Sequence, residues 1–190
     1  MPSLYRYLFP VMWLSWAAYW WIASRDVKPT TRREPLAWRV SYIGPLMLAA
    51  LLFAVPNLPP PALHARFLPR TEWVLVIATA LTAAGLLLAV WARRCLGRNW
   101  SAILAIKEGH QLITTGPYAM ARHPIYAGLL LAVAGSAMAL GEWRALLAAG
   151  VALVAFVHKL RLEERWMHEQ FGEEYRAYCQ RVSALIPLVI

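Results

Sequence analysis

The chain has 190 residues, of which 60% are apolar and only 15% are charged. A soluble domain has about 45–50% apolar and about 25% charged residues, so the composition excludes a disordered chain or a small secreted scaffold and indicates an integral membrane protein. The net charge of +9 favours an anionic partner. Because the basic residues lie between apolar runs, that partner is a membrane surface rather than nucleic acid.

Five apolar runs contain no Asp, Glu, Lys or Arg, namely 8–23, 42–55, 73–92, 125–140 and 145–157. A bilayer core of about 30 Å requires about 20 helical residues, and the third run alone reaches this length. The sequence predicts an all-α polytopic membrane bundle of about five transmembrane helices, folded as a single domain over residues 1–190.

The last two runs are expected to form a helical hairpin around 141–144. Small residues such as Ala132, Ser136 and Ala152 would allow its two helices to approach closely. The alternative is a hairpin that does not fully cross the bilayer.

Basic residues also predict the orientation of the chain. Fifteen of the nineteen Lys and Arg residues fall in the segments 24–41, 93–124 and 158–190, which share one side of the membrane. Because cytoplasmic segments carry the excess of Lys and Arg, we expect the N-terminus outside and the C-terminus in the cytosol.

Polar chemistry is concentrated in two of these segments, the loop 93–124 and the tail 158–190. The apolar runs contain no ionisable group of the kind that pumps place in the membrane, which disfavours ion transport. We expect the loop and the C-terminal helices to close a cytosolic cofactor pocket against the hairpin.

The loop ends in the segment GPYAMARHPIYAG, residues 116–128. Pro124 suits the first turn of a helix, so Arg122 and His123 are predicted at a helix N-terminus, which favours a carboxylate or phosphate. Tyr126 and Gly128 follow in the first turns, where Gly128 would let a ligand approach the backbone. In the alternative interpretation Arg122 reaches lipid phosphate, His123 is a plain N-cap and Tyr126 is an interfacial anchor.

The tail is predicted to contain a helix over 159–170, a stop at Gly172 and a short helix over 173–182. Glu163 and Glu164 would lie near the bilayer surface and bind a cation, or would form ordinary pairs such as Lys159–Glu163. Glu164 and His168 have no clear third ligand, so no metal site is predicted.

These segments resemble the integral membrane methyltransferases of the isoprenylcysteine carboxyl methyltransferase and phospholipid N-methyltransferase superfamily. The matching motifs cover about residues 91–190. They are Leu96-Gly97, Trp100-Ser101, Gly116-Pro117-Tyr118, Arg122-His123-Pro124, Tyr126, Gly128, Glu163-Glu164, Phe171-Gly172, Tyr175, Tyr178 and Pro187.

The resemblance implies transfer of a methyl group from S-adenosylmethionine to a lipophilic acceptor in the membrane. The acceptor would be the carboxylate of a prenylcysteine-like compound or a lipid amine. The residues implied to bind the cofactor are Lys107, Gln111, Leu112, Ile113, Gly116, Tyr118, His123, Pro124, Tyr126, Gly128 and Glu164.

Catalytic roles are implied for Arg122, Glu163 and Glu164, and which glutamate contacts the cofactor stays open. A carboxylate acceptor is already ionised and needs an anchor, Arg122 or Arg161. An amine must first lose a proton to a base, for which Glu163, Glu164 or His123 would serve. The sequence does not choose between the two acceptors.

Two alternatives to a methyltransferase remain. Membrane sterol or enone reductases share part of this C-terminal architecture and use NADPH, although they are usually longer. A non-catalytic membrane scaffold could also be built on the same fold. The oligomeric state is not predicted.

Overall fold

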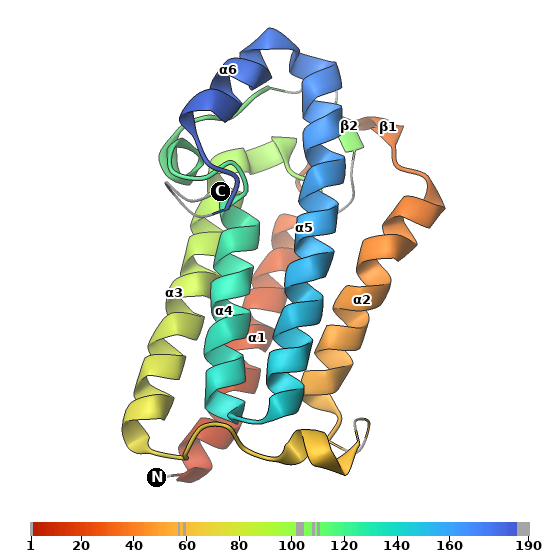
Figure 1. The fold of residues 1–190 in the computed structure, drawn as a ribbon. Coiled ribbons are helices and arrows are strands. Elements are labelled where there is room, and N and C mark those ends of the chain that lie inside the picture. The colour runs from red at the N-terminus through yellow and green to blue at the C-terminus, as the bar shows by residue number, and fades with distance from the viewer. Residues whose placement is uncertain are drawn as a thin grey trace.

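The computed structural model describes residues 2–185 with the exception of 57, 59, 102–104, 108 and 110. Five long helices run side by side, and the two ends of the described chain lie at opposite ends of this bundle (Figure 1). The helices are α1 (Pro2–Ala23), α2 (Leu36–Ala54), α3 (Glu72–Leu96), α4 (Pro124–Leu140) and α5 (Trp143–Phe171). A short helix, α6 (Glu173–Arg181), folds back over the bundle from the end of α5. The predicted helical architecture is confirmed.

Three of the described helices are long and apolar enough to cross a membrane, namely α2, α3 and α5. Helix α4 is apolar but has only 17 residues. It lies between α3 and α5 in the bundle (Figure 1). The integral membrane character of the chain follows from these helices, whereas the number of five spans remains a prediction.

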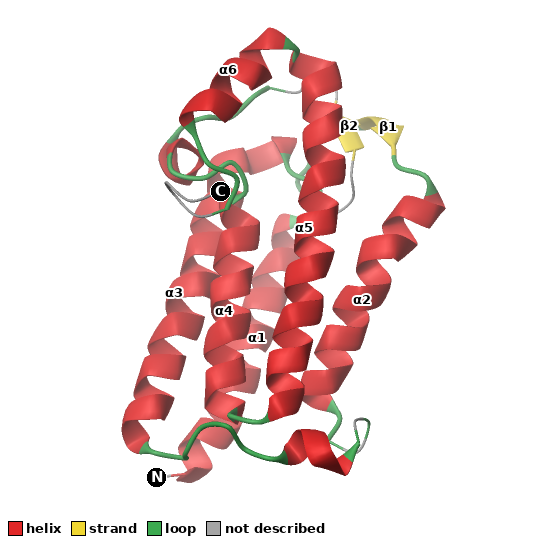
Figure 2. Cartoon of the chain, viewed as in Figure 1, coloured by secondary structure: helices red, strands yellow, loops and turns green. Residues whose placement is uncertain are grey.

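Two short strands were not predicted from the sequence. Strand β1 (Thr30–Arg33) pairs with β2 (Ala105–Lys107) in antiparallel register, with Thr30 opposite Lys107 (Figure 2). Near this pair, the backbone N–H of Lys28 donates to the carbonyl of Arg98 at 2.9 Å. The connection between α1 and α2 therefore holds the loop that follows α3.

Helices α3 and α4 approach each other closely because small residues line both contact faces. A Cβ placed on Gly128 would lie 2.5 Å from the carbonyl oxygen of Gly85, and one placed on Gly135 would lie 2.5 Å from Oγ1 of Thr82. Ala132 is fully buried at the same contact. Close approach of backbones is a common way to pack helices in membranes, where apolar burial gives little driving force.

The small residues predicted to join the last two helices thus contact other partners. Ala132 faces α3, and Ala152 clusters with Ala49 and Leu52 of α2. Ser136 accepts a hydrogen bond from Nε1 of Trp13 in α1 at 3.0 Å. The hairpin prediction is correct, but its closest backbone contact was assigned to the wrong neighbour, because small residues mark a contact face without naming the helix that fills it.

Helix α5 is continuous over 29 residues, so the fifth apolar run and the predicted tail helix are one element. At 1.5 Å per residue it is about 43 Å long, which exceeds the bilayer core of about 30 Å. Its C-terminal turns therefore extend beyond the apolar run and carry Glu163 and Glu164. Gly172 ends the helix with a φ of +51°, as predicted for this stop.

At the opposite end of the bundle, a clamp joins the α2–α3 connection to the α4–α5 turn. The η1 turn (Pro61–His64) supplies His64, whose Nδ1 lies 3.4 Å from Oε2 of Glu142. The same oxygen accepts from Nε of Arg144 at 2.7 Å, and Nη1 of Arg144 donates to the carbonyl of Leu52 at 2.9 Å. Burial would raise the pKa of Glu142, but Arg144 and His64 outweigh it and hold that pKa below its ordinary value.

Gly128→Ala should destabilise the protein because the added methyl group meets the α3 backbone. The expected loss is about 1–3 kcal/mol, typical of overpacking, and it is measured by thermal unfolding in detergent. Gly150→Ala is the matched control, since no atom lies within 4 Å of a Cβ there and Ala favours helix by about 1 kcal/mol. Equal melting temperatures for the two variants would contradict this account of the α3–α4 contact.

Acid should weaken the clamp at Glu142. Because the pKa of this carboxyl is lowered in the folded state, its contribution to stability is complete above the ordinary pKa of 4.5 and declines as the pH falls through the folded value. Melting temperatures measured from pH 7 to pH 3 should fall less steeply in Glu142→Gln, which is less stable at neutral pH. Parallel curves for the variant and the wild type would contradict the assignment.

Candidate functional site

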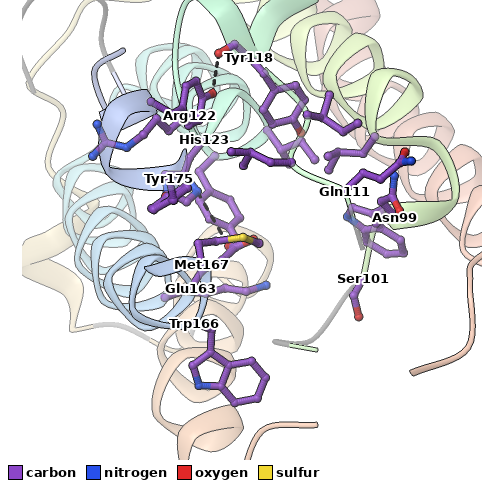
Figure 3. A pocket seen from close by; sticks show the side chains of 18 of the residues that line it. Asn99, Ser101, Gln111, Tyr118, Arg122, His123, Glu163, Trp166, Met167 and Tyr175 are labelled. Atoms are coloured by element: carbon purple, nitrogen blue, oxygen red, sulfur yellow. Dashed lines mark hydrogen bonds and ion pairs between the residues drawn. The ribbon is translucent and has the colours of Figure 1, made fainter. Parts of the chain in front are cut away.

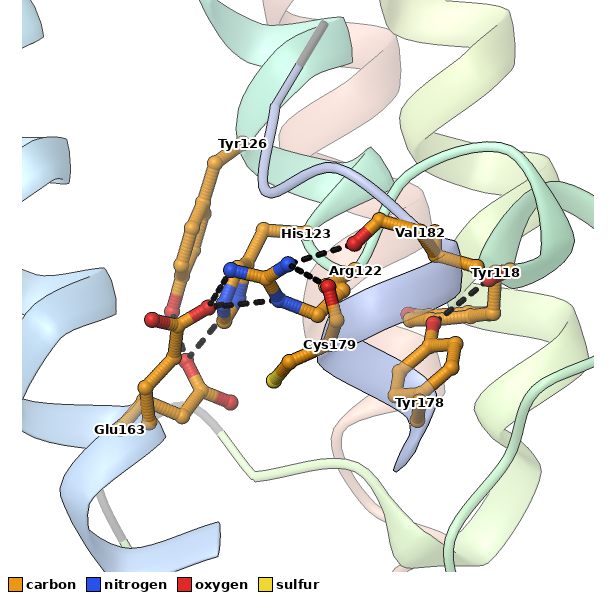
Figure 4. A network of polar contacts seen from close by, with 9 residues as sticks. Tyr118, Arg122, His123, Tyr126, Glu163, Tyr178, Cys179 and Val182 are labelled. Carbon is orange, nitrogen blue, oxygen red and sulfur yellow. Dashed lines mark hydrogen bonds and ion pairs between the residues drawn. The ribbon is translucent and has the colours of Figure 1, made fainter. Parts of the chain in front are cut away.

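Arg122 ties three parts of the chain together at the α6 end of the bundle. Its Nε and Nη2 donate to Oε1 of Glu164 in α5 at 2.8 and 2.7 Å. Its Nη1 donates to the carbonyl of Val182 at 2.5 Å and lies 3.4 Å from that of Cys179 (Figure 4). Burial acts to lower the pKa of Arg122, but Glu164 outweighs burial and the pKa lies above its ordinary value.

His123 is the N-cap residue of α4, at the helix N-terminus as predicted, but its ring does not cap the helix. No side-chain cap bond forms, and Pro124 occupies the first helical position. The backbone N–H of His123 donates to the carbonyl of Ala184 at 2.9 Å. The ring Nε2 lies 3.3 Å from Oε1 of Glu164, so the imidazole faces α5 instead of its own helix end.

Tyr126 lies one turn into α4, and its hydroxyl donates to Oε2 of Glu163 at 2.7 Å. Its ring is stacked on that of His123, with centroids 5.5 Å apart, and on that of Phe156, with centroids 5.2 Å apart. The two glutamates share His123, whose Nε2 lies 3.3 Å from Oε1 of Glu164 and whose Nδ1 lies 3.9 Å from Oε2 of Glu163. They differ in their other partners: Glu164 accepts from Arg122, whereas Glu163 accepts from Tyr126.

Two further tyrosines close the site from the loop and from α6. The hydroxyl of Tyr178 donates to the backbone carbonyl of Tyr118 at 2.5 Å. Burial raises the pKa of Tyr178 to about 12 and raises that of Tyr118 well above its ordinary value. Both phenols are neutral at physiological pH, so neither acts as a base in the ionised form.

A cavity of about 220 Å³ lies beside this network (Figure 3). Asn99 and Gln111 lie across it from Arg122 and His123. Part of its apolar lining comes from the bundle helices and from the residue after η2 (Gly97–Asn99), namely Trp16, Trp20, Trp100, Leu129 and Phe156. The end of α5 adds Trp166, Met167 and Phe171. The cavity thus connects an aromatic interior with a polar end.

Most of the residues implied to form the site do surround this cavity. Those that line it are Gln111, Leu112, Ile113, Tyr118, Arg122, His123, Tyr126 and Glu163. Glu164, Gly116 and Pro124 are not in the lining; Glu164 contacts Arg122 and His123 from behind. The side chain of Lys107 and residue Pro187 lie outside the described residues.

The structure places two of the implied residues elsewhere. Gly128 was expected to let a ligand approach, but the α3 backbone fills that space, so the glycine serves helix packing. Arg161 is exposed on α5 and is not part of the cavity lining. It points away because residues at i and i+2 of a helix lie on different faces, and Glu163 takes the inner face.

The structure adds residues that sequence reasoning did not select. Lys159 and Asn99 line the cavity, as do Trp16 and Trp20 from α1. Lys159 lies one helical turn before Glu163, a spacing that was available in the sequence. Nothing in the sequence indicated that α1 reaches the site. Among the described residues, no group of three His, Cys, Asp or Glu side chains is placed to hold a metal ion.

Residues 73–174 match the phospholipid methyltransferase family. The matched segment covers more than half of the chain and contains most of the polar residues around the cavity. The chain belongs to the phospholipid methyltransferase family. This membership bears out the resemblance drawn from the motifs.

Two relatives of this family member have names that differ in the atom methylated, and a third is named for metal resistance. Protein-S-isoprenylcysteine O-methyltransferase B of Arabidopsis thaliana is 30% identical over 120 residues, which are 62% of this chain and 61% of the relative. Methanethiol S-methyltransferase 1 of Bradyrhizobium diazoefficiens is 45% identical over 71 residues, 37% of this chain and 24% of the relative. The cobalt-zinc-cadmium resistance protein CzcN of Cupriavidus metallidurans is 30% identical over 160 residues, 83% of this chain and 65% of the relative.

A solved structure shares the fold of this phospholipid methyltransferase family member. It is the eukaryotic intramembrane Ras methyltransferase, an isoprenylcysteine carboxyl methyltransferase, with a TM-score of 0.55 and 24% sequence identity. The similarity covers 84% of this chain and 55% of that one. The chain spans less than two thirds of the length of the relatives named here.

Arg122→Ala should release α6 and the tail from the bundle. Removing one partner of a largely buried ion pair costs on the order of 3 kcal/mol, and here it also removes the donor to the Val182 carbonyl. Hydrogen exchange over residues 173–185 should become faster. Arg181→Ala is the control, because the hydrogen bond that this exposed α6 residue makes within the described part of the chain is local, to the carbonyl of Ala177. Unchanged exchange in Arg122→Ala would contradict the role of Arg122 in holding α6 and the tail.

Proposed function

We propose that the protein is an S-adenosylmethionine-dependent methyltransferase acting on a lipophilic acceptor. The observation that carries this proposal is a cavity that joins aromatic side chains of the bundle to the polar end containing His123 and Glu163, two residues of the segment that matches the family. An acceptor dissolved in the bilayer would occupy the apolar part of the cavity, and its reactive group would lie in the polar part.

The residues around the cavity fit this cofactor. Oδ1 of Asn99 is buried and has no hydrogen-bond partner among the described residues, so it offers an acceptor to an amino or hydroxyl group. The carboxylate of Glu163 lies at the cavity wall and suits a sulfonium cation by its charge. When bound, the cofactor supplies an electrophilic methyl group: the acceptor atom forms a bond to its carbon as the carbon–sulfur bond breaks and leaves its electron pair on sulfur.

Asn99, Gln111, His123, Tyr126 and Glu163 would hold the cofactor. Glu164 and Arg122 would act as positioning residues, because each is already engaged by the other. The Glu164 carboxylate orients the His123 ring from behind the cavity wall. Most of the rate acceleration would come from holding the reacting atoms in line.

A carboxylate is the acceptor group that the geometry favours. Arg122, one of the expected anchors, is occupied by Glu164, and Arg161 lies outside the cavity. Lys159 lines the cavity and supplies the positive charge for an anchor. A carboxylate is ionised at neutral pH and needs no base, so Lys159 would bind and orient it while Glu163 faces the cofactor.

The family match favours this interpretation over the reductase alternative. We also propose that the α6 end faces the cytosol, with the N-terminus on the other side. That orientation rests on the distribution of Lys and Arg along the chain.

Calorimetric titration of the detergent-purified protein with S-adenosylmethionine, S-adenosylhomocysteine and NADPH tests the proposal. The two adenosyl compounds should bind and NADPH should not. Glu163→Gln should weaken cofactor binding roughly tenfold or more, since a hydrogen bond to a charged group contributes about 1.5–3 kcal/mol, and Asn99→Ala should weaken it less. Arg165→Ala, an exposed change on α5, is the control.

Each other outcome has a distinct meaning. Binding of NADPH alone would overturn the proposal in favour of an NADPH-dependent membrane reductase. A folded protein that binds none of the three compounds would overturn the proposal and would support the alternative of a non-catalytic membrane scaffold.

A further inference from the structure

Glu34 is a buried carboxylate in a part of the chain that precedes the family match. It lies between β1 and α2, and its side chain has 0% exposure. Its Oε1 accepts from the hydroxyl of Tyr42 at 2.6 Å and lies 3.4 Å from Nε of Arg39. Its Oε2 has no hydrogen-bond partner among the described residues. A buried carboxylate is costly unless it is paired, so this arrangement calls for a physical reason.

Tyr42 links this carboxylate to the cavity. The residue is 1% exposed, and the Nζ atom of Lys159 lies 4.8 Å from its ring centroid. Lys159 lines the cavity, and the same Nζ lies 5.5 Å from the ring centroid of Tyr126. A contact path therefore runs from Glu34 through Tyr42 to the ammonium group at the cavity wall.

We propose that Glu34 and Tyr42 are positioning residues for Lys159. The face of the Tyr42 ring holds the ammonium group at the cavity wall, and Glu34 strengthens that hold through the Tyr42 hydroxyl. The consequence for the reaction, a fixed positive charge for an anionic acceptor group, rests on the proposed function.

The physical basis is the attraction of a cation to the electron-rich face of an aromatic ring, which strengthens when the groups are shielded from water. A phenol that donates to a carboxylate is polarised toward phenolate, so its ring face becomes more negative. Burial acts to lower the pKa of the Lys159 ammonium group, and the carboxylates of Glu163, on its own helix, and of Glu34 oppose that shift. Glu163 also accepts from Tyr126, and the ring of Tyr42 is a contact that α2 contributes to Lys159.

Chemical labelling of Lys159 tests the proposal without knowledge of the acceptor. The chain has three lysines, Lys28, Lys107 and Lys159, which mass spectrometry can distinguish. N-hydroxysuccinimide acetate reacts only with an uncharged amine, so a firmly held ammonium group reacts slowly. We expect Glu34→Gln and Tyr42→Phe each to raise the labelling rate of Lys159 relative to Lys28 by roughly three- to thirtyfold.

Ser41→Ala is the matched control. Ser41 precedes Tyr42 on α2 and its Oγ lies 2.8 Å from Nε2 of His158, which precedes Lys159 on α5. This variant removes an exposed contact between the same two helices without touching the cavity. Its labelling rate should change less than twofold.

The double variant shows whether Glu34 acts through Tyr42. In the Tyr42→Phe background, Glu34→Gln should add less than twofold, because the hydroxyl that transmits its effect is absent. If the two substitutions multiply each other's effect on the labelling rate, Glu34 does not act through Tyr42. Unchanged labelling rates in both folded single variants would overturn the proposal. Melting temperatures verify folding, and either single variant suffices if the other fails to fold.

This outcome is separable from that of the proposed function. Titration with S-adenosylmethionine on the same samples should give wild-type affinity in Tyr42→Phe, since Tyr42 is not part of the cavity lining. Absence of binding in the wild type would overturn the methyltransferase and leave the labelling rates to decide the roles of Glu34 and Tyr42.

Discussion

The ion pair between Arg122 and Glu164 joins the last turns of α5 to the residues just before α4, and through Val182 it also holds the tail after α6. Each of these segments is short, and the ion pair ties them to one another. The pair is largely shielded from water, with side chains 13% and 21% exposed, so its attraction is stronger than that of a surface pair. The cavity exists because this connection keeps the tail on top of the bundle.

The bundle beneath is built by a different force. In a bilayer, apolar burial does not drive helices together, so close backbone contact and a few hydrogen bonds must do so. Gly85 and Gly128 provide the backbone contact between α3 and α4, and the bond from Trp13 to Ser136 brings α1 onto the same surface. This packing fixes α4, whose N-terminus holds His123, and so it sets where the site lies.

Charges in the cavity are separated by role. Glu163 presents a carboxylate beside the aromatic rings, while Glu164 is neutralised by Arg122 behind the wall. Lys159 supplies a positive charge on the same helix as both glutamates, one turn before Glu163. Opposite charges on one helix face suit a reaction between a cationic donor and an anionic acceptor, which is the chemistry proposed for this protein.

The sequence by itself determined the helical membrane class, the hairpin turn at Gly141 and the helix start at Pro124. These features depend on local rules: apolar run length, glycine at positive φ and the fixed φ of proline. It also indicated the motif residues that line the cavity, because they lie within one continuous segment of this chain, on the loop and the helix that follows it. Only the tertiary structure decided that Gly128 packs against α3, that Arg122 is engaged by Glu164, and that Glu34, Tyr42, Trp16 and Trp20 lie at or next to the site. Those facts depend on which helices become neighbours, and amphipathic or small-residue patterns mark a contact face without specifying the partner that covers it.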